Sequence, residues 1–428
     1  MTFVRPDGFA PALAQHRPMA VLMAIALPLA ALDTARRKRW PARPAALGNL
    51  GLLVLVVGIS VATTGWLGGG VAAVATFLPA ALGGVLTVLN ITSWRRLRMA
   101  SSVIVWCMVG LTSLSIYSYY TGYDAPRYVL QEHGSLPTNG DQPYVPAEHA
   151  GQGVLFRIRS VGILADPNDF AQMMVVALAL LWGLRRQRGL ISSGVLLALP
   201  TCILLAGMYL THSRGALIGT GLAVVAGLWR ALGAVRSSLL LGLGGLAAKA
   251  INYTGGRAIS DAGESAAHRI DYWNLGLHLM ARHPLFGVGF NNFENFNVAT
   301  GQTAHNSFIL CAAELGLVGM FLWMSLLVFA FQATSQAIRL TGDSPQMRSL
   351  ATALRAALVG FLGCAWFLSR TYDPLLYMLL GLCLASHYCL EGPAPEARRW
   401  ASLTIRWSLL ALVVLYVFVV GQRIAGHS

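Results

Sequence analysis

The sequence predicts an all-α polytopic membrane protein with about twelve transmembrane helices and two larger external loops. Of the 428 residues, 56% are hydrophobic and 11% are charged, and the mean hydropathy is +0.60. Apolar runs recur along the chain at close to the roughly 20 residues that a helix needs to cross a hydrocarbon core. Each run must be a helix, because lipid offers no hydrogen-bond partner to an open backbone and the runs lack the alternation of barrel strands.

Twelve apolar runs approach this length. They lie at residues 18–34, 46–67, 71–92, 100–120, 169–184, 190–211, 215–233, 237–252, 306–335, 349–369, 373–390 and 403–421. The first run is predicted to be a retained span and not a cleaved signal peptide, because a basic cluster follows it instead of preceding it. Since the sequence shows no internal repeat, residues 1–428 are predicted to form a single transmembrane domain.

The orientation follows from the arginines, because short loops rich in Lys and Arg stay on the cytoplasmic side of the membrane. Basic clusters follow alternate spans, at residues 36–39, 95–98, 185–188, 230–236, 339–348 and 398–399. If all of them face the cytoplasm, residues 121–168, residues 253–305 and the turn 211–214 face the periplasm. The net charge of +14 is mostly this topological signal. No nucleic-acid partner is predicted, since no soluble basic face interleaved with aromatic residues is visible.

The two external loops differ in character. Residues 121–168 hold many charged residues and prolines, which indicates a polar periplasmic loop and not a linker between domains. Within residues 253–305, the stretch from Ala266 to Arg282 places apolar side chains three and four positions apart. This spacing predicts an amphipathic helix that lies along the membrane surface or covers a site.

The cysteines argue against a metal centre. All six lie in apolar segments, and none forms a CxxC pair. Neither a disulfide framework nor a zinc site is therefore predicted, and packing is the expected role of these thiols. No cofactor is predicted either.

Three arginines on the predicted outer face are candidates for binding an anion. Arg157 and Arg159 precede a helix start at residues 166–169, and Arg214 lies in a very short turn between two spans, beside Gly215. A guanidinium is permanently charged and its geometry matches phosphate oxygens, so these positions suit a diphosphate at the membrane surface. The alternatives are a plain helix cap at 166–169, snorkelling side chains at 157 and 159, and an interfacial anchor at 214.

His305 is the candidate catalytic base. It lies at the end of the second external loop, where Asn306 and Ser307 add polar groups to the start of an apolar helix. A helix N-terminus disfavours the imidazolium, which helps to keep the imidazole neutral and able to accept a proton. A capping or packing histidine is the alternative interpretation.

Several of these segments together resemble the O-antigen ligase and polymerase superfamily. The matching features are Arg159 before Pro-Asn-Asp-Phe-Ala at 167–171, Ser-Arg-Gly at 213–215, His-Pro-Leu-Phe-Gly-Val-Gly at 283–289, Ala-His-Asn-Ser-Phe at 304–308 with Glu-Leu-Gly at 314–316, and Ser-Arg-Thr-Tyr-Asp at 369–373. They span residues 157 to 381 in the family's order. Ile218 stands where ligases usually have Leu, four positions after the arginine, which weakens the choice of ligase over polymerase.

The resemblance implies a GT-C-like glycosyltransferase of the bacterial inner membrane, with its active site facing the periplasm. Its donor would be a glycan linked to undecaprenyl diphosphate, and its acceptor a sugar hydroxyl of lipid A–core, both in contact with membrane lipid. No metal or nucleotide is implied. His305 would remove the acceptor proton, Arg214 would stabilise the diphosphate, and Arg157, Arg159, Asn306 and Arg370 would bind substrate.

Three alternatives stay open. A polymerase of the same superfamily would use a second carrier-linked glycan as its acceptor. A protein O-oligosaccharyltransferase would need a groove for an acceptor protein. A transporter of lipid-linked glycan should carry polar residues near the centres of its spans, whereas here the unusual residues gather at outer helix ends.

Overall fold

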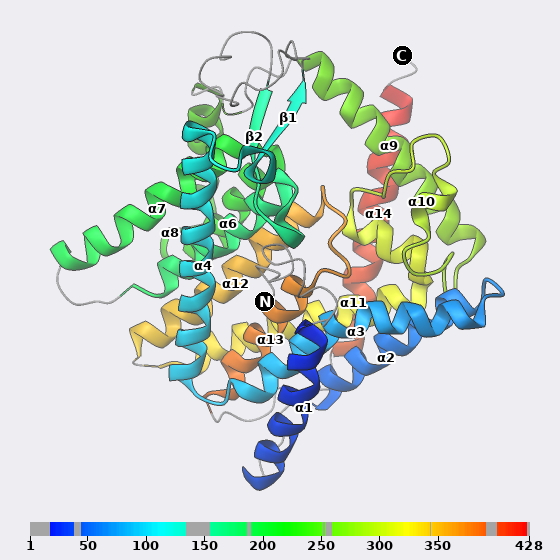
Figure 1. Cartoon of the computed structure of the whole chain (residues 1–428), viewed down its shortest axis with the longest axis horizontal. Helices are drawn as coiled ribbons and strands as arrows, with labels where there is room; N and C mark the ends of the chain where they lie inside the picture. Colours follow the sequence, from blue (N-terminus) through cyan, green and yellow to red (C-terminus); the bar gives the residue numbers. More distant parts are fainter. Residues whose placement is uncertain are drawn as a thin grey trace. The chain divides into compact units, whose positions relative to one another are not determined.

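The computed structural model describes residues 18–37, 44–133, 155–185, 190–250, 253, 259–342, 344–390 and 400–425. The chain divides into two compact units, each built from segments far apart in the sequence. Unit 1 comprises residues 1–18, 95–257 and 341–364, and unit 2 comprises residues 19–94, 258–340 and 365–428. Both units are built mainly from helices (Figure 1). The arrangement as a single membrane domain stays a prediction.

Unit 1 combines long helices with one small sheet. Its elements are α4 (Trp94–Thr121), α5 (Ala125–Tyr128), β1 (Val129–His133), β2 (Leu155–Ile158), the 3₁₀ turn η4 (Gly162–Leu164), α6 (Pro167–Gly183), α7 (Leu190–Thr211), α8 (Arg214–Ala250) and α12 (Pro345–Ala365). Helix α6 packs against α7 and α8, and β2 contacts α7. The antiparallel strands pair Leu130 with Arg157, and a cluster of buried side chains that includes Tyr128 and Phe156 forms their core.

Unit 2 is arranged around one long helix. Its elements are α1 (Pro18–Arg37), α2 (Pro44–Ala62), α3 (Leu67–Asn90), α9 (Ile259–Arg282), α10 (Phe293–Phe296), α11 (Ser307–Leu340), α13 (Pro374–Tyr388) and α14 (Trp400–Ala425). Helix α11 contacts α2, α9, α13 and α14. In its most apolar stretch 78% of the residues are buried, against 17% in α14, so α11 is the core helix of unit 2 and α14 presents its side chains outward.

The prediction of a helical polytopic membrane protein is confirmed. By length and composition, six helices of the described residues could cross a membrane: 45–62, 67–90, 94–121, 307–340, 345–365 and 401–421. Shorter apolar helices lie at 197–211, 214–229, 235–246 and 374–388. Each of the twelve predicted runs lies largely in helix within the described residues. The runs 215–233 and 237–252 share the label α8, but Gly233 (φ 75°, ψ 173°) is not helical and separates two helical stretches there. The count of twelve spans stays a prediction.

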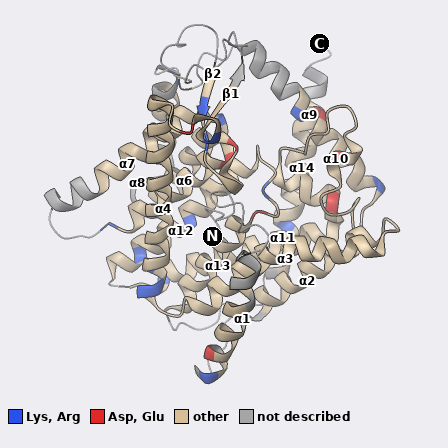
Figure 2. Ribbon diagram, viewed as in Figure 1, with Lys and Arg blue, Asp and Glu red and all other residues tan. Residues whose placement is uncertain are grey.

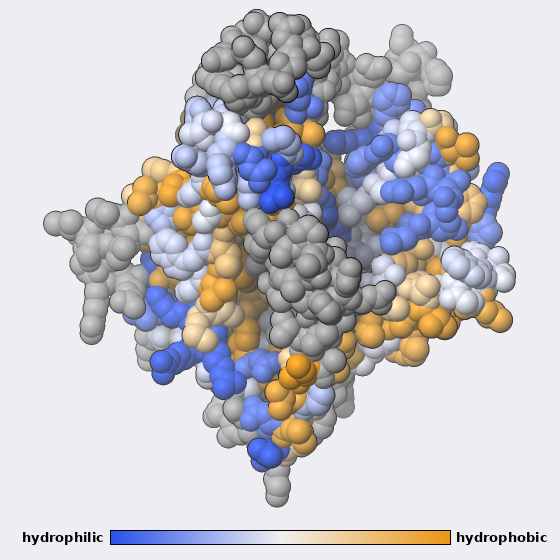
Figure 3. Space-filling view, in the orientation of Figure 1, coloured by the Kyte–Doolittle hydropathy of each residue, from blue (hydrophilic) through white to orange (hydrophobic). Residues whose placement is uncertain are grey.

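The surface has the pattern that lipid requires of a membrane protein. Apolar side chains such as Leu52, Leu55 and Val71 are exposed on α2 and α3, and Figure 3 shows apolar atoms gathered along these two helices. In the described residues, Lys and Arg occur repeatedly near helix ends (Figure 2). This distribution is the one expected of membrane helices, in which charged groups avoid the hydrocarbon and apolar groups face it.

The predicted external loops contain regular structure. Helix α9 includes the stretch 266–282 for which the spacing predicted an amphipathic helix, and it packs against α11 and α14. In the other loop, the described residues form α5 and the pair of strands β1 and β2, which the sequence did not predict. Residues 134–154 of that loop lie outside the described residues.

A break in α11 connects this helix to the preceding loop. Gly316 adopts φ 64° and ψ −166° inside the helix, so the neighbouring backbone groups lose their helical partners. The segment 284–289 replaces them: the N–H groups of Val288 and Gly289 donate to the carbonyls of Ala313 and Glu314 at 2.9 and 3.0 Å, and Leu317 N–H donates to the Pro284 carbonyl at 2.8 Å. This pairing fixes the loop 284–306 against the core of unit 2.

We expect Gly316→Ala to destabilise the protein. A Cβ at this position would lie 2.5 Å from the backbone carbonyl carbon of Leu285, and a non-glycine residue at this φ costs about 1–3 kcal/mol from strain alone. Thermal unfolding in detergent should show the loss. The matched control is Gly51→Ala in α2, where an added Cβ meets no atom within 4 Å. Equal midpoints for the two variants would contradict the role given to the break.

Candidate functional site

Arg157 is a buried arginine whose donors are largely used inside unit 1. Its side chain is 2% exposed. Nε donates to the Thr211 carbonyl at 2.6 Å, and Nη2 donates to Asn168 Oδ1 at 2.8 Å. The guanidinium thus joins strand β2 to the end of α7 and to the start of α6, where Asp166 caps the helix by accepting from the N–H groups of Asn168 and Asp169. Burial without bonding would be costly for such a group, and these bonds satisfy it.

Arg159 lies two residues further along, at the end of the strand, and is less occupied. Its Nη2 donates to the Pro126 carbonyl at 2.6 Å, and its own carbonyl accepts from the Ser115 hydroxyl at 2.8 Å. Its Nε is buried and has no hydrogen-bond partner among the residues that the structure describes. Arg159 therefore has an unused hydrogen-bond donor, whereas the donors of Arg157 are largely used.

The turn between α7 and α8 is held rigidly by the residues around it. His212 is buried and adopts a left-handed φ of 49°. Its Nδ1 lies 2.8 Å from the Tyr253 carbonyl, and the Tyr253 hydroxyl donates to the Met208 carbonyl at 3.0 Å. Burial raises the pKa of Tyr253 above its ordinary value, which keeps this hydroxyl protonated as a donor. His212 is thus a structural residue of the turn.

Arg214 is the first residue of α8 and differs from its neighbours in having unused donors. It is partly exposed, and within the described part of the chain no side chain or carbonyl accepts a hydrogen bond from its guanidinium. The N-terminus of a helix carries unpaired N–H groups and a partial positive charge, which adds to the charge of the arginine. The turn 211–214 therefore presents a cation at a position that favours an anion.

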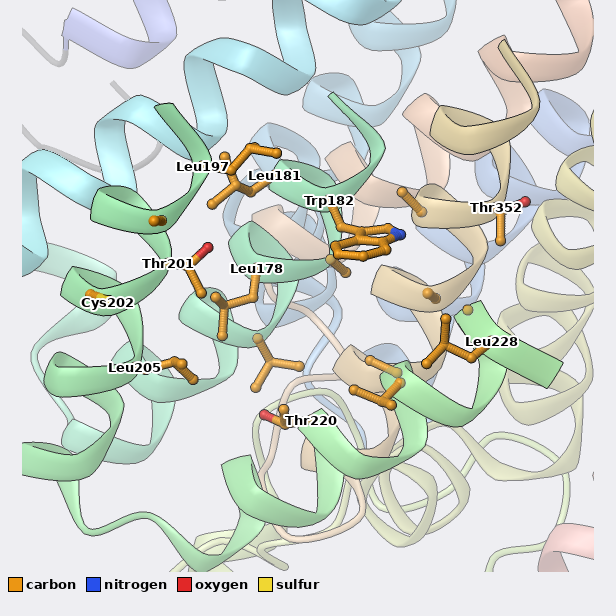
Figure 4. Close-up of a pocket in the computed structure, with 18 residues that line it drawn as sticks. Leu178, Leu181, Trp182, Leu197, Thr201, Cys202, Leu205, Thr220, Leu228 and Thr352 are labelled. Carbon is orange, nitrogen blue, oxygen red and sulfur yellow. The ribbon is translucent and has the colours of Figure 1, made fainter. Parts of the chain in front are cut away.

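An apolar groove runs along the same helix. It has a volume of about 610 Å³ and lies between α6, α7, α8 and α12 (Figure 4). Leu178 and Trp182 line it from α6, Leu205 lines it from α7, and Thr220 and Leu228 line it from α8. At about 1.5 Å per helical residue, Thr220 and Leu228 lie about 9 and 21 Å along the axis of α8 from Arg214. None of the lining residues is charged, so the groove suits a hydrocarbon chain.

His305 occupies the corresponding place in unit 2, two residues before α11. It adopts a left-handed φ of 47° and is partly exposed. Its Nε2 lies 3.4 Å from Gln302 Oε1, and its ring centroid lies 6.2 Å from that of Tyr272 on α9. The sequence predicted His305 at the end of a loop and the start of a helix. The contacts with Gln302 and Tyr272 were missed, because one depends on the loop conformation and the other on the packing of two helices.

Asn306 caps the helix that follows. Its Oδ1 accepts from the N–H groups of Phe308 and Ile309 at 2.9 and 3.1 Å. The residue is fully buried, and its Nδ2 finds no partner among the described residues. The cap fixes the direction in which the chain leaves His305, so the structure gives Asn306 a positioning contact beside the predicted base.

Arg370 is brought to the same turn by its backbone. Its N–H donates to Ser307 Oγ at 2.7 Å, Ser307 Oγ donates to the Leu368 carbonyl at 2.6 Å, and Thr371 Oγ1 donates to the Ser307 carbonyl at 2.7 Å. Its guanidinium forms an ion pair with Asp373 at 3.1 Å. Serine 307, which the sequence offered as just one more polar group, holds two segments of the chain together here.

Unit 2 also buries the carboxylate of Glu314. Glu314 Oε1 accepts from the N–H of Phe293 at 3.1 Å, and the residue is 2% exposed. This bond attaches the segment 291–293 to α11 next to the break at Gly316. Across the described residues, no three His, Cys, Asp or Glu side chains come together as a metal site requires.

The candidate residues fall into two sets. The structure places Arg157, Arg159 and Arg214 in unit 1, around the hairpin and the α7–α8 turn, and His305, Asn306 and Arg370 in unit 2, around the start of α11. Residues 199–324 match the O-antigen ligase family, which confirms the resemblance inferred from the sequence motifs. The matched segment includes Arg214 and His305. No curated protein matches the chain.

Accessibility tests the predicted orientation. In a background with the native cysteines replaced, Thr121→Cys and Gln302→Cys should react with a membrane-impermeant maleimide added to the periplasm, because both positions are exposed in the predicted outer loops. Gln346→Cys, exposed in the first turn of α12 on the predicted cytoplasmic side, is the matched control and should react after the membrane is opened. Labelling of either loop variant from the cytoplasm alone would overturn the orientation.

Proposed function

We propose that this protein is an O-antigen ligase-like glycosyltransferase of the bacterial inner membrane. It moves a polysaccharide from undecaprenyl diphosphate to a sugar hydroxyl of lipid A–core at the periplasmic face. His305 is the general base, Arg214 and Arg159 bind the diphosphate, and Arg370 assists. The reaction requires no metal and inverts the configuration of the anomeric carbon. The support for placing both sets of residues at one membrane face is the distribution of arginines along the sequence.

The observation that carries this proposal is the combination of Arg214 with the apolar groove. A lipid-linked diphosphate has an anionic head and a long hydrocarbon chain. Arg214 offers a guanidinium with unused donors at a helix N-terminus, and the groove begins about 9 Å further along that helix, at Thr220. One element thus offers a site for each half of the molecule, which a simple interfacial anchor does not require.

The proposed chemistry is a direct displacement. The acceptor oxygen attacks the anomeric carbon while the bond from that carbon to the diphosphate oxygen breaks. The acceptor proton moves to the His305 imidazole and later to solvent, and undecaprenyl diphosphate leaves with the electron pair of the broken bond. The arginines stabilise the charge that develops on the leaving oxygen. Since attack and departure occur on opposite faces of the carbon, the configuration inverts.

A reconstituted assay tests the function. The purified protein in lipid nanodiscs is incubated with an undecaprenyl-diphosphate-linked glycan and rough lipopolysaccharide, in the presence of EDTA and without nucleotide. A new glycan–lipid A–core conjugate is the expected product. A second reaction without lipopolysaccharide identifies a polymerase, since longer carrier-linked glycan would then form. No product in either reaction would refute the proposal.

We expect Arg214→Lys to remain impaired and Arg214→Ala to lose most activity at normal protein levels. Lysine restores the positive charge but not the paired donors that match a phosphate, so charge alone should not rescue transfer. The loss should appear as weaker donor binding and a lower rate, about 10-fold or more for alanine. Arg127→Ala, which removes an exposed arginine paired with Asp124, is the control. Near-normal transfer by Arg214→Ala would return Arg214 to the role of an anchor.

His305→Ala should fold and insert normally yet lose about 10²–10⁴-fold in transfer rate, the usual contribution of a general base. His305→Gln keeps hydrogen bonding but takes up no proton at neutral pH. Loss in both variants supports proton abstraction, whereas activity retained by the glutamine variant means that His305 positions the acceptor. Donor binding should survive in both, because the arginines hold the diphosphate. Loss of donor binding by a folded His305→Ala would show that the assigned roles are wrong.

A further inference from the structure

His305 is not isolated on its turn, and its neighbours have a common property. Tyr272 lies on α9, and its ring is 6.2 Å from the His305 ring at an interplanar angle of 37°. One helical turn earlier on α9, His268 stacks with Tyr272 at 6.4 Å and 18°. Gln302 Oε1 lies 3.4 Å from His305 Nε2. The phenol ring offers a negative π face and the amide offers a carbonyl oxygen, and both are complementary to a positive charge.

The fold keeps these neighbours in place. Helix α9 packs against α11, and Trp273, the residue after Tyr272, is 3% exposed and contacts the rings of Trp366 and Phe418. Asn297 Nδ2 donates to the Gln302 carbonyl at 2.8 Å, which fixes the backbone that carries the amide. Tyr272 and Gln302 therefore approach His305 from two elements that are each anchored elsewhere.

We propose that Tyr272 and Gln302 are positioning residues that orient the His305 imidazole and stabilise the imidazolium formed when it takes the acceptor proton. This inference rests on the proposed function. A cation about 6 Å from the centroid of a Tyr ring is attracted by the ring face, and the amide oxygen accepts the N–H that protonation creates or retains. Both contacts favour the protonated form, so both make His305 a stronger base than it would be alone.

The described parts of the surrounding elements carry other titratable or charged groups. They are His268, Arg269, Asp271, His278 and Arg282 on α9, Glu294 on α10, Glu314 and Arg339 on α11, and the Arg370–Asp373 ion pair on the segment that bonds to Ser307. Arg370 and Asp373 largely cancel as a pair. Tyr272 and Gln302 are uncharged, so their effect on His305 is separable from these charges by substitutions that leave all of them in place.

The pH profile of transfer distinguishes this role from a purely structural one. If Tyr272 stabilises the imidazolium, Tyr272→Leu should move the acid limb of kcat/KM to lower pH by about half a unit, a roughly 3-fold change in the protonation equilibrium. The plateau at high pH should fall as well, because a weaker base removes the proton less effectively. Tyr272→Phe keeps the ring and should retain the wild-type limb.

Substitutions of Gln302 should shift the acid limb in either direction, depending on the charge that they introduce. Gln302→Leu removes the hydrogen-bond acceptor and should move the acid limb of kcat/KM to lower pH, as Tyr272→Leu does. Gln302→Glu places a carboxylate beside His305 Nε2 and should move the acid limb to higher pH, because a nearby negative charge favours the protonated imidazole. His278→Leu is the control on the same helix, since His278 is exposed and its Nδ1 lies 2.8 Å from the Asn274 carbonyl of its own helix. Its profile should match the wild type.

The outcomes distinguish the positioning role of Tyr272 and Gln302 from the role of His305 as the base. The variants are compared at matched thermal stability and donor binding. A lower plateau with an unmoved acid limb in Tyr272→Leu and in both Gln302 variants would overturn this inference and leave His305 as the base. If His305→Ala retains its activity, the assignment of His305 as the base fails, and the role inferred for Tyr272 and Gln302 fails with it.

Discussion

The need to pair backbone groups at the break in α11 determines how the loop before this helix is held in unit 2. In a membrane environment an unpaired carbonyl or N–H is costly, and a helix interrupted at Gly316 exposes several. The segment 284–289 pairs with them, and Glu314 accepts from the N–H of Phe293 at the same place. The loop that ends at His305 thus begins from a fixed point on the helix that follows it. The loop 284–306 is therefore attached to α11 at its start as well as at its end.

The need to satisfy buried polar groups also explains why Arg157 and Arg214 in unit 1 differ in how many of their hydrogen-bond donors are used. Arg157 gives its donors to the Thr211 carbonyl and to Asn168, so it stabilises the junction of β2, α6 and α7. Because Arg157 makes these contacts, the α7–α8 turn also carries a second guanidinium, that of Arg214, which no described group satisfies. The role proposed for Arg214, binding an anion, needs unused donors, and they are left unused because a different arginine, Arg157, makes the structural contacts.

Much of the helical fold could be predicted from the sequence. Which of the candidate side chains are bonded into the structure and which keep unused donors could not. Apolar runs predict helices because lipid leaves the backbone no alternative, and the spacing of apolar residues predicted α9. The strands β1 and β2 are short and carry polar residues, so periodicity did not reveal them. Whether Arg157 or Arg214 is occupied depends on carbonyls and amides far along the chain. The contact of Tyr272 with His305 depends on how α9 packs against α11.

His212 and His305 show how one local structure serves two purposes. Both are left-handed residues two positions before a long helix, and both precede a capping side chain, Ser213 or Asn306. The His212 ring is buried at 2.8 Å from a backbone carbonyl, a contact that fixes its orientation. The His305 ring is partly exposed, and its contact with Gln302 is 3.4 Å. A base must reach its substrate and change its protonation state, which a ring bonded into the interior does poorly. The local sequence selects the turn, and the lower burial of the His305 ring makes it, and not His212, the histidine that we propose as the base.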